Sequence, residues 1–226
     1  MARIEVRDLQ VNLGGRTVLQ HVDLSVADGE LVYLLGRNGA GKSTLLRTLC
    51  GMVPPAGGSV AIDGPVGMHL GTDTVHPGHT ARRHLRWFAA ASGVRADRVD
   101  EVLARTGVDA YGDRRIGSYS LGMRQRLGIA TALLPDADAL VFDEPLNGLD
   151  VEGIAWLREL LTDLARDGRA VVVASHLLSE VERTADRIAV VDRRTATPAV
   201  PLAEFLGTHP DLESAYLAAV SPGVAA

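Results

Sequence analysis

Gly36-Arg37-Asn38-Gly39-Ala40-Gly41-Lys42-Ser43 matches the pattern G-x-x-x-x-G-K-[ST] at every fixed position. In this pattern the glycines let backbone N–H groups converge on phosphate oxygens, while Lys42 supplies a positive charge and Ser43 a hydroxyl for Mg²⁺. Residues 30–35 before it have the composition of a short buried strand, and residues 43–49 after it read as a helix whose N-terminus attracts anions. The stretch therefore predicts a nucleoside triphosphate site, in which Thr44 is the last phosphate-binding residue.

The composition predicts one soluble globular unit. The chain has 226 residues, of which 46% are hydrophobic, and this is enough to bury a core. Its net charge of −5 argues against a nucleic-acid binder that works by bulk positive charge. Cys50 is the single cysteine, so no internal disulfide can form. We see no signal segment and no apolar run near the ~18–20 residues that a membrane span needs, so another chain would have to supply it.

Hydrophobic patterning predicts an α/β fold. Residues 4–26 alternate between apolar and polar, as in half-buried strands, with a turn at residues 14–15. Residues 80–134 are mostly helical in pattern, and a helix over residues 151–166 separates two all-apolar runs, residues 139–142 and 170–174. Buried strands that alternate with helices indicate a parallel sheet covered on both faces.

An acidic pair, Asp143-Glu144, follows the first of these apolar runs directly. Reactive groups in open α/β sheets gather at the carboxyl ends of strands. There an Asp can hold Mg²⁺, directly or through water, and a neighbouring Glu can deprotonate an attacking water. Taken alone, such a pair is more typical of a strand end that meets solvent. On a chain with a phosphate loop, we interpret it as catalytic.

Two further features suit phosphate chemistry. His176 follows the second apolar run and could hydrogen-bond a γ-phosphate or a water, although a helix cap or an exposed histidine is the simpler interpretation in isolation. Ser120 and the amides after it open a helix, which makes a second anion-binding helix start. One nucleotide does not need two such starts, so Ser120 would make sense as a contact to the nucleotide of a partner chain.

Together, these four elements resemble the ATP-binding-cassette (ABC) family of ATPases over about residues 3–192. The specific part is residues 120–126, which look like the family signature LSGGQ-x-QR with Tyr119, Leu121 and Met123 at three positions. That variant is similar to the one in ATPase subunits of antibiotic and drug exporters. Glu144 looks like the catalytic Glu, and His176 falls where the switch histidine lies. The D-loop of the family resembles the residues after Glu144, namely Asn147, Gly148, Leu149 and Asp150.

The resemblance implies an α/β fold with a P-loop NTPase core and a mostly parallel sheet. An N-terminal antiparallel β-subdomain and a helical subdomain that carries the signature would complete it. We expect a single ABC-type ATPase domain over residues 1–226. Residues 1–70 and 135–192 would form the nucleotide-binding core with its β-subdomain, residues 71–134 the helical subdomain, and residues 193–226 a C-terminal appendage with a small helical part.

The resemblance also implies a function: ATP binding and hydrolysis, with ATP and Mg²⁺ as ligands, in a transporter subunit, as in exporters. Ser43 and Asp143 would handle Mg²⁺, Glu144 would be the base and His176 would sense the γ-phosphate. Two chains would pack head to tail, and a separate transmembrane subunit would hold the chain at the cytoplasmic face of the membrane, with no nucleic-acid partner. The residues that would act in trans on the partner's ATP are Ser120, Leu121, Gly122 and Met123.

Two positions depart from the family pattern. Leu13 stands where an aromatic residue usually stacks on adenine, with Val18 nearby, so we expect an apolar but unstacked contact with the base. Gly71 stands where the Q-loop glutamine aligns, a residue that helps to bind Mg²⁺ and links the site to the membrane subunit. Asp73 lies two positions further on, and the sequence does not say whether it substitutes. The docking groove for the membrane subunit would lie between about residues 71 and 87.

Other interpretations remain open at this stage. A non-transport ABC ATPase that acts on ribosomes or DNA is one, although such proteins usually carry two cassettes or a long coiled coil. A regulatory half-site that holds ATP without turnover is another, favoured by Leu13 and Gly71 but opposed by the intact Glu144 and His176. Among side features, Trp87 and Phe88 read as packing of the helical subdomain, residues 193–194 as a solvated turn, and four histidines match no zinc spacing: His69, His76, His79 and His84.

Overall fold

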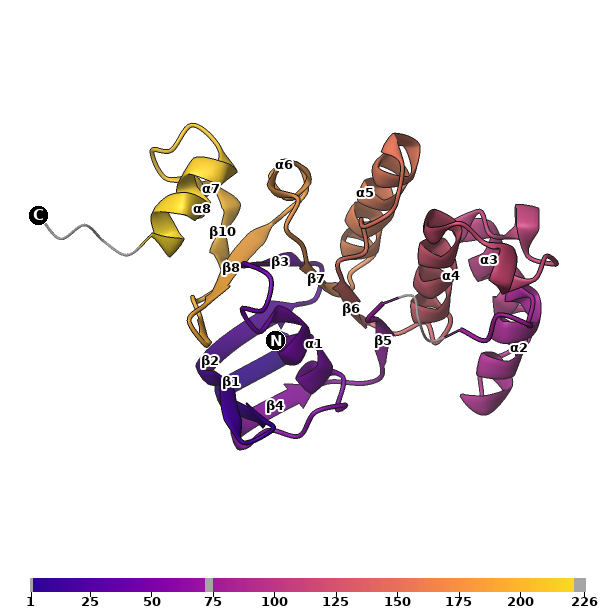
Figure 1. The fold of residues 1–226 in the computed structure, drawn as a ribbon, viewed down its shortest axis with the longest axis horizontal. Helices are drawn as coiled ribbons and strands as arrows, with labels where there is room; N and C mark the ends of the chain where they lie inside the picture. Colours follow the sequence, from indigo (N-terminus) through magenta and orange to yellow (C-terminus); the bar gives the residue numbers. More distant parts are fainter. Residues whose placement is uncertain (1, 72–74, 222–226) are drawn as a thin grey trace, which may run out of the picture.

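An antiparallel sheet forms the N-terminal part of the protein in the computed structural model, which describes residues 2–71 and 75–221 (Figure 1). Its strand order is β2-β1-β4, and the turn between β1 and β2 consists of Gly14 and Gly15, both with positive φ. The alternation in the sequence produces one buried and one exposed face. The bounds are β1 (Ala2–Leu13), β2 (Arg16–Ala27) and β4 (Gly57–Ile62).

The second sheet has the order β10-β8-β3-β7-β6-β5, with β9 paired to β8. Each pair of adjacent strands from β8 to β5 is parallel, whereas the short strands β9 and β10 pair with β8 in antiparallel fashion. The mostly parallel sheet that the sequence predicts is therefore confirmed. Its strands are β3 (Leu31–Leu35), β5 (Val66–His69), β6 (Ala139–Asp143), β7 (Ala170–Ala174), β8 (Arg187–Asp192), β9 (Thr195–Ala196) and β10 (Val200–Pro201).

Both faces of this sheet are buried, which explains the uninterrupted apolar runs. Along β3, Tyr33 contributes to a core with the helical part and α5, while its neighbours Val32 and Leu34 contribute to a core with α1 and the N-terminal sheet. Helix α1 thus lies between the two sheets (Figure 1). The helices of the core are α1 (Lys42–Leu49), α5 (Val151–Arg166) and α6 (Leu178–Val181).

Strand β5 is not singled out by the sequence patterns, because Gly67 and His69 interrupt its apolar residues, and β8, β9 and β10 were not predicted either. Gly67 is required there, since a Cβ atom would lie 2.2 Å from the Ala132 carbonyl oxygen of the neighbouring helix. The close approach lets β5 join the sheet edge next to β6. Residues 66–69 are therefore the last residues of the core before the chain enters the helical part.

The helical part lies at one end of the molecule, at the right of Figure 1, and contains α2 (Ala81–Ala91), α3 (Arg98–Thr106) and α4 (Leu121–Leu133). Thr80 caps α2, as the sequence predicts, by accepting a hydrogen bond from the Arg83 N–H at 3.2 Å. Trp87 differs from expectation, because its side chain is 62% exposed, with its ring edge-on to that of Phe88. Of this aromatic pair, only Phe88 packs against the core.

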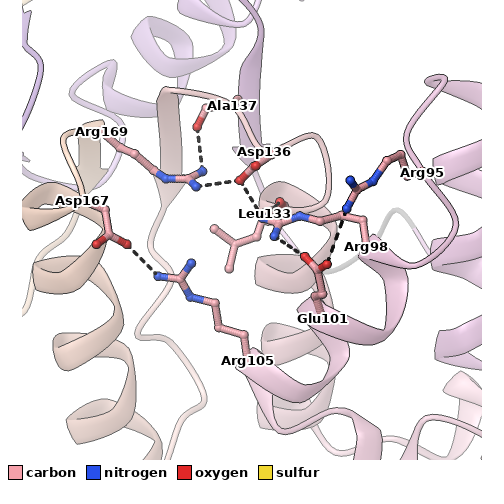
Figure 2. A network of polar contacts seen from close by, with 9 residues as sticks. All are labelled: Arg95, Arg98, Glu101, Arg105, Leu133, Asp136, Ala137, Asp167 and Arg169. Carbon is pink, nitrogen blue, oxygen red and sulfur yellow. Dashed lines mark hydrogen bonds and ion pairs between the residues drawn. The ribbon is translucent and has the colours of Figure 1, made fainter.

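A cluster of ion pairs connects the helical part to the core (Figure 2), and we call it the junction cluster. Asp136, in the loop between α4 and β6, accepts hydrogen bonds from Arg98 of α3 at 2.7 Å and from Arg169 beside β7 at 2.6 Å. A second pair, Arg105 with Asp167, spans the same junction at 3.4 Å. These contacts link α3 to the loop after α4 and to the segment between α5 and β7.

The C-terminal part comprises two short helices, α7 (Leu202–Leu206) and α8 (Leu212–Val220), opposite the helical part in Figure 1. Leu212 is fully buried, and its N–H donates to Glu182 at 3.0 Å, so α8 is attached to the core. Within residues 2–71 and 75–221, no helix has both the length and the apolar character that crossing a membrane requires.

Candidate functional site

The phosphate loop connects β3 to α1 and encloses a cavity of about 210 Å³. Its glycines are required by geometry: at Gly36 a Cβ atom would lie 2.4 Å from the Val191 carbonyl oxygen, and Gly41 has a φ of 114° at the start of α1. The first N–H groups of α1 have no partner within the helix and face the loop. The lining residues are Val18, Arg37, Asn38, Gly39, Gly41, Lys42, Ser43, Thr44 and Glu144.

Lys42 is the buried cation of this cavity, with an exposed fraction of only 5%. Its ammonium donates to the Gly36 carbonyl at 2.6 Å and lies 3.6 Å from a carboxylate oxygen of Glu144. A buried ammonium beside converging backbone N–H groups makes the cavity complementary to a polyanion. The geometry is thus suited to phosphate groups.

Asp143 and Glu144 stand at the carboxyl end of β6, next to the cavity. Glu144 has a φ of 49°, an unfavourable value for a non-glycine residue, and its backbone is fixed by a hydrogen bond from its N–H to the Ala174 carbonyl at 2.9 Å. Gln125 of α4 donates to the Glu144 carbonyl at 3.1 Å. In the described part of the chain, the buried Oδ1 of Asp143 has no hydrogen-bond partner. One carboxylate is therefore held in place and the other is left free to bind.

His176 brings a third group to the same carboxylate. Its Nδ1 lies 2.7 Å from Oε2 of Glu144, and its side chain is 47% exposed. Glu144 therefore faces the Lys42 ammonium through one oxygen and the His176 ring through the other. Three residues from three different segments meet at the mouth of the phosphate cavity.

The start of α4 lies elsewhere in the same chain. Ser120 caps α4 by accepting a hydrogen bond from the Met123 N–H at 3.2 Å, and the helix begins at Leu121, directly after Ser120 as the sequence predicts. Leu121 is 53% exposed and packs so closely on Gly148 that a Cβ atom there would lie 2.3 Å from its side chain. Ser120 is not among the described residues that line the phosphate cavity.

The segment that resembles the D-loop lies under this helix start. A Cβ atom on Gly122 would lie 3.1 Å from the Gly148 carbonyl oxygen, so the two segments touch within one chain. Asn147 is exposed and Leu149 is half-buried. Asp150 caps α5, with its Oδ1 accepting from the Gly153 N–H at 2.8 Å. The segments that resemble the signature and the D-loop are thus in contact within one chain.

The two positions that depart from the family pattern have different surroundings. Leu13 is 41% exposed and pairs with Arg16 across the turn. It lines neither the phosphate cavity nor a second cavity that adjoins the phosphate loop, whereas Val18 lines both. Gly71 has a φ of 118° and borders an apolar cavity of about 290 Å³. Asp73 lies outside the described residues.

Sequence reasoning assigned no role to two residues near the site, Gln125 and His69. Gln125 stands inside the signature, which was the available signal. His69 carried no such signal; it is 3% exposed, and its ring occupies the space that a Cβ atom on Gly128 of α4 would need. Burial lowers the pKa of His69, against the charge of the nearby Asp143. Among the described residues, no three His, Cys, Asp or Glu side chains gather as a metal site would require.

Comparison with known families identifies this arrangement. The family described as ABC transporter matches residues 19–147, which is more than half of the chain. The chain belongs to the ABC transporter family. The matched segment contains the phosphate loop, the signature and the acidic pair.

Several curated relatives of this ABC transporter chain are ATP-binding proteins. The uncharacterized ABC transporter ATP-binding protein YhcH of Bacillus subtilis is 37% identical over 84% of this chain and 67% of its own length. The bacitracin transport ATP-binding protein BcrA of Bacillus licheniformis is 34% identical over 88% of this chain and 69% of its own length. The lantibiotic transport ATP-binding protein SrtF of Streptococcus pyogenes is 32% identical, covering 83% and 86%. The chain thus spans about two thirds of the length of YhcH and BcrA.

Solved structures agree with the fold. An ATP-binding subunit of an ABC transporter superposes with a TM-score of 0.87 at 25% identity, covering 95% of this chain and 98% of that one. A bacterial ABC transporter cassette solved as a dimer gives a TM-score of 0.80 at 23% identity, covering 88% and 98%. The expected fold class is confirmed: this is an ABC-type ATP-binding chain with a parallel core sheet, an antiparallel β-subdomain and a helical part.

Proposed function

We propose that this chain hydrolyses ATP to drive an ABC exporter, as one domain made of a core, a helical subdomain and a C-terminal appendage. One observation carries the catalytic part: the Glu144 carboxylate stands between Lys42 and His176 at the mouth of the phosphate cavity. A carboxylate in that position can accept the proton of a water that attacks the γ-phosphate. His176 keeps this carboxylate oriented and can itself donate to a phosphate oxygen.

The donor set also suits Mg²⁺. This hard cation prefers oxygen ligands, and the unpartnered buried Oδ1 of Asp143 together with the Ser43 hydroxyl provides such ligands beside the cavity. When bound, Mg²⁺ would neutralise charge that develops on the β- and γ-phosphate oxygens. Lys42 holds the same phosphates as a fixed charge, and the loop amides orient them.

The second part of the proposal is a head-to-tail dimer. Ser120 caps an exposed helix start and is not among the described residues that line the phosphate cavity, so the nucleotide on a partner chain is the natural occupant. The contact of Leu121 with Gly148 would let the signature and the D-loop move together at such an interface. The similar cassette solved as a dimer supports this arrangement.

The third part concerns the membrane. The apolar cavity beside Gly71 also includes Met52, Met68 and Phe88, and two of these side chains, Met52 and Met68, are exposed at 59% and 44%. Such a surface suits an amphipathic helix of a separate transmembrane subunit, which would hold this chain at the cytoplasmic face. The names of the relatives BcrA and SrtF, which concern bacitracin and lantibiotic transport, support an exporter over a protein that acts on ribosomes or DNA.

The decisive experiment is Glu144→Gln in the purified chain, with Lys42→Ala as the contrasting variant. We expect Glu144→Gln to bind ATP normally and to lose turnover by ~10²–10⁴-fold, because only the base is removed. Lys42→Ala should lose nucleotide binding itself. Turnover at the wild-type rate in Glu144→Gln would remove Glu144 from the mechanism. A wild-type chain that binds ATP but never hydrolyses it, alone or with its membrane subunit, would favour the regulatory half-site.

A further inference from the structure

A second cavity, of about 650 Å³, opens beside the phosphate loop. It shares Val18 and Gly39 with the phosphate cavity, so the two hollows adjoin. A nucleotide whose phosphates occupy the first cavity would therefore extend its ribose and base toward the second. No aromatic residue is among the described residues that line it.

Three arginines make the lining of this second cavity positively charged. Its lining includes Arg16 from the start of β2 and Arg193 and Arg194 from the turn between β8 and β9, and no carboxylate. In the described part of the chain, the side chains of Arg16 and Arg194 make no ion pair or hydrogen bond, and Arg193 has only Asp192 at 3.5 Å. On a chain of net charge −5, the three arginines concentrate positive charge and planar guanidinium groups around this one cavity.

The backbone of the turn supports a ligand role. Arg193 and Arg194 have φ values of 45° and 74°, a left-handed conformation that two-residue hairpin turns usually satisfy with Asn and Gly. Arginine in this conformation carries a backbone cost. The turn is nevertheless held firmly on β2, because the Gln20 N–H donates to the Arg194 carbonyl at 2.7 Å. A strained but anchored turn places both side chains beside the phosphate loop.

The geometry of the β1–β2 turn explains what replaces the missing aromatic residue. Leu13 pairs directly with Arg16 across Gly14 and Gly15, so the two side chains share one face of the hairpin. Only Arg16 reaches the cavity. A guanidinium is planar and weakly hydrated, and it stacks on nucleobases as an aromatic ring does, whereas leucine cannot.

We propose that Arg16, supported by Arg193 and Arg194, forms the base-recognition subsite of this chain, with the Arg16 guanidinium stacked on the base of a nucleoside triphosphate. This inference rests on the proposed ATP-binding function and deepens it. It replaces the apolar contact through Leu13 that the sequence predicts. Because every base offers a π face, the subsite holds ATP and GTP with similar strength.

The test measures binding by titration calorimetry with Mg²⁺ and three probes: ATP, GTP and inorganic triphosphate. Arg16→Lys keeps the charge but loses the plane, so it should weaken ATP and GTP by roughly tenfold or more and leave inorganic triphosphate unchanged. Arg47→Ala is the matched control, because Arg47 is an exposed arginine of α1 that lines neither cavity. It should bind all three probes as the wild type does.

The outcomes separate the subsite from the function on which it rests. Wild-type affinity for ATP in Arg16→Lys overturns the subsite alone, as does an equal loss for ATP and inorganic triphosphate. A wild-type chain that binds none of the three probes overturns the proposed function as well. The double change Arg193→Gly with Arg194→Gly should relieve the strained turn, so that the free chain unfolds at no lower temperature while ATP binds more weakly. Unchanged ATP affinity in that variant removes the turn from the subsite.

Discussion

The junction cluster yields a quantitative prediction for Asp136→Asn. The Asp136 carboxylate accepts hydrogen bonds from Arg98 and Arg169 at 2.7 and 2.6 Å, as Figure 2 shows. These arginine side chains are only 17% and 15% exposed, so the substitution leaves two poorly solvated cations near each other. Asn is the suitable replacement, because Asp136 has a φ of 55° and Asn tolerates this conformation.

The magnitude follows from the burial of the partners. An exposed ion pair is worth ~0.2–1 kcal/mol, and hydrogen bonds to charged groups reach ~1.5–3 kcal/mol when buried. The carboxylate itself is 56% exposed, so its two contacts must be discounted toward the lower figure. We expect Asp136→Asn to cost about 1–2 kcal/mol in the free energy of unfolding, with the exposed-pair scale as the guide. For a chain of this size, that lowers Tm by about 2–8 °C.

The pH dependence has a definite sign. The hydrogen bond from Arg169, together with the charges of Arg98 and Arg169, lowers the pKa of Asp136 in the folded protein. A depressed carboxylate pKa stabilises the fold above the unfolded value, near 3.9, and this contribution is lost as pH falls through the folded pKa. The difference between wild type and Asp136→Asn should therefore be constant above about pH 5 and shrink below about pH 4.

Thermal unfolding followed by circular dichroism from pH 3 to pH 8 is the assay. Asp163→Asn provides the control, because Asp163 and its partner Arg166 are 61% and 76% exposed at 3.7 Å and should contribute almost nothing. An unchanged Tm for Asp136→Asn at pH 7 would refute the role of the cluster. A difference that persists undiminished at pH 3 would refute its electrostatic origin.

Two further predictions concern packing and assembly. Gly128→Ala should destabilise the chain by about 1–3 kcal/mol in chemical denaturation, because its Cβ atom would meet the His69 ring at 2.3 Å; adding His69→Ala should restore part of this loss, and no restoration would mean that the ring is not the obstacle. Ser120→Arg should leave ATP binding by the isolated chain intact but abolish ATP-dependent dimers in sedimentation, with Ser118→Arg, also exposed and just before the helix start, as the control. Dimers that persist in Ser120→Arg would contradict the head-to-tail proposal.

Much of the fold was predictable because its signals are local. The phosphate loop is eight consecutive residues with a strand before and a helix after it, and the all-apolar runs of β6 and β7 report burial on two faces. The capping residues Thr80 and Ser120 act within one helical turn, so their roles are also readable. Strand β5 was not predictable in this way, because the close approach of α4, and not the pattern of the strand itself, requires a glycine at position 67.

The sequence by itself determined the phosphate loop, the acidic pair at a strand end and the alternation of strands and helices, because each depends on residues that are neighbours in the chain. Only the tertiary structure decided that His176 meets Glu144 and that Arg193 lies with Arg16 around one cavity. These residues come from distant segments: the pairing of β6 with β7 brings Glu144 to His176, and the packing of the β8–β9 turn on β2 brings Arg193 to Arg16. These contacts result from packing of the whole core, which no local pattern encodes.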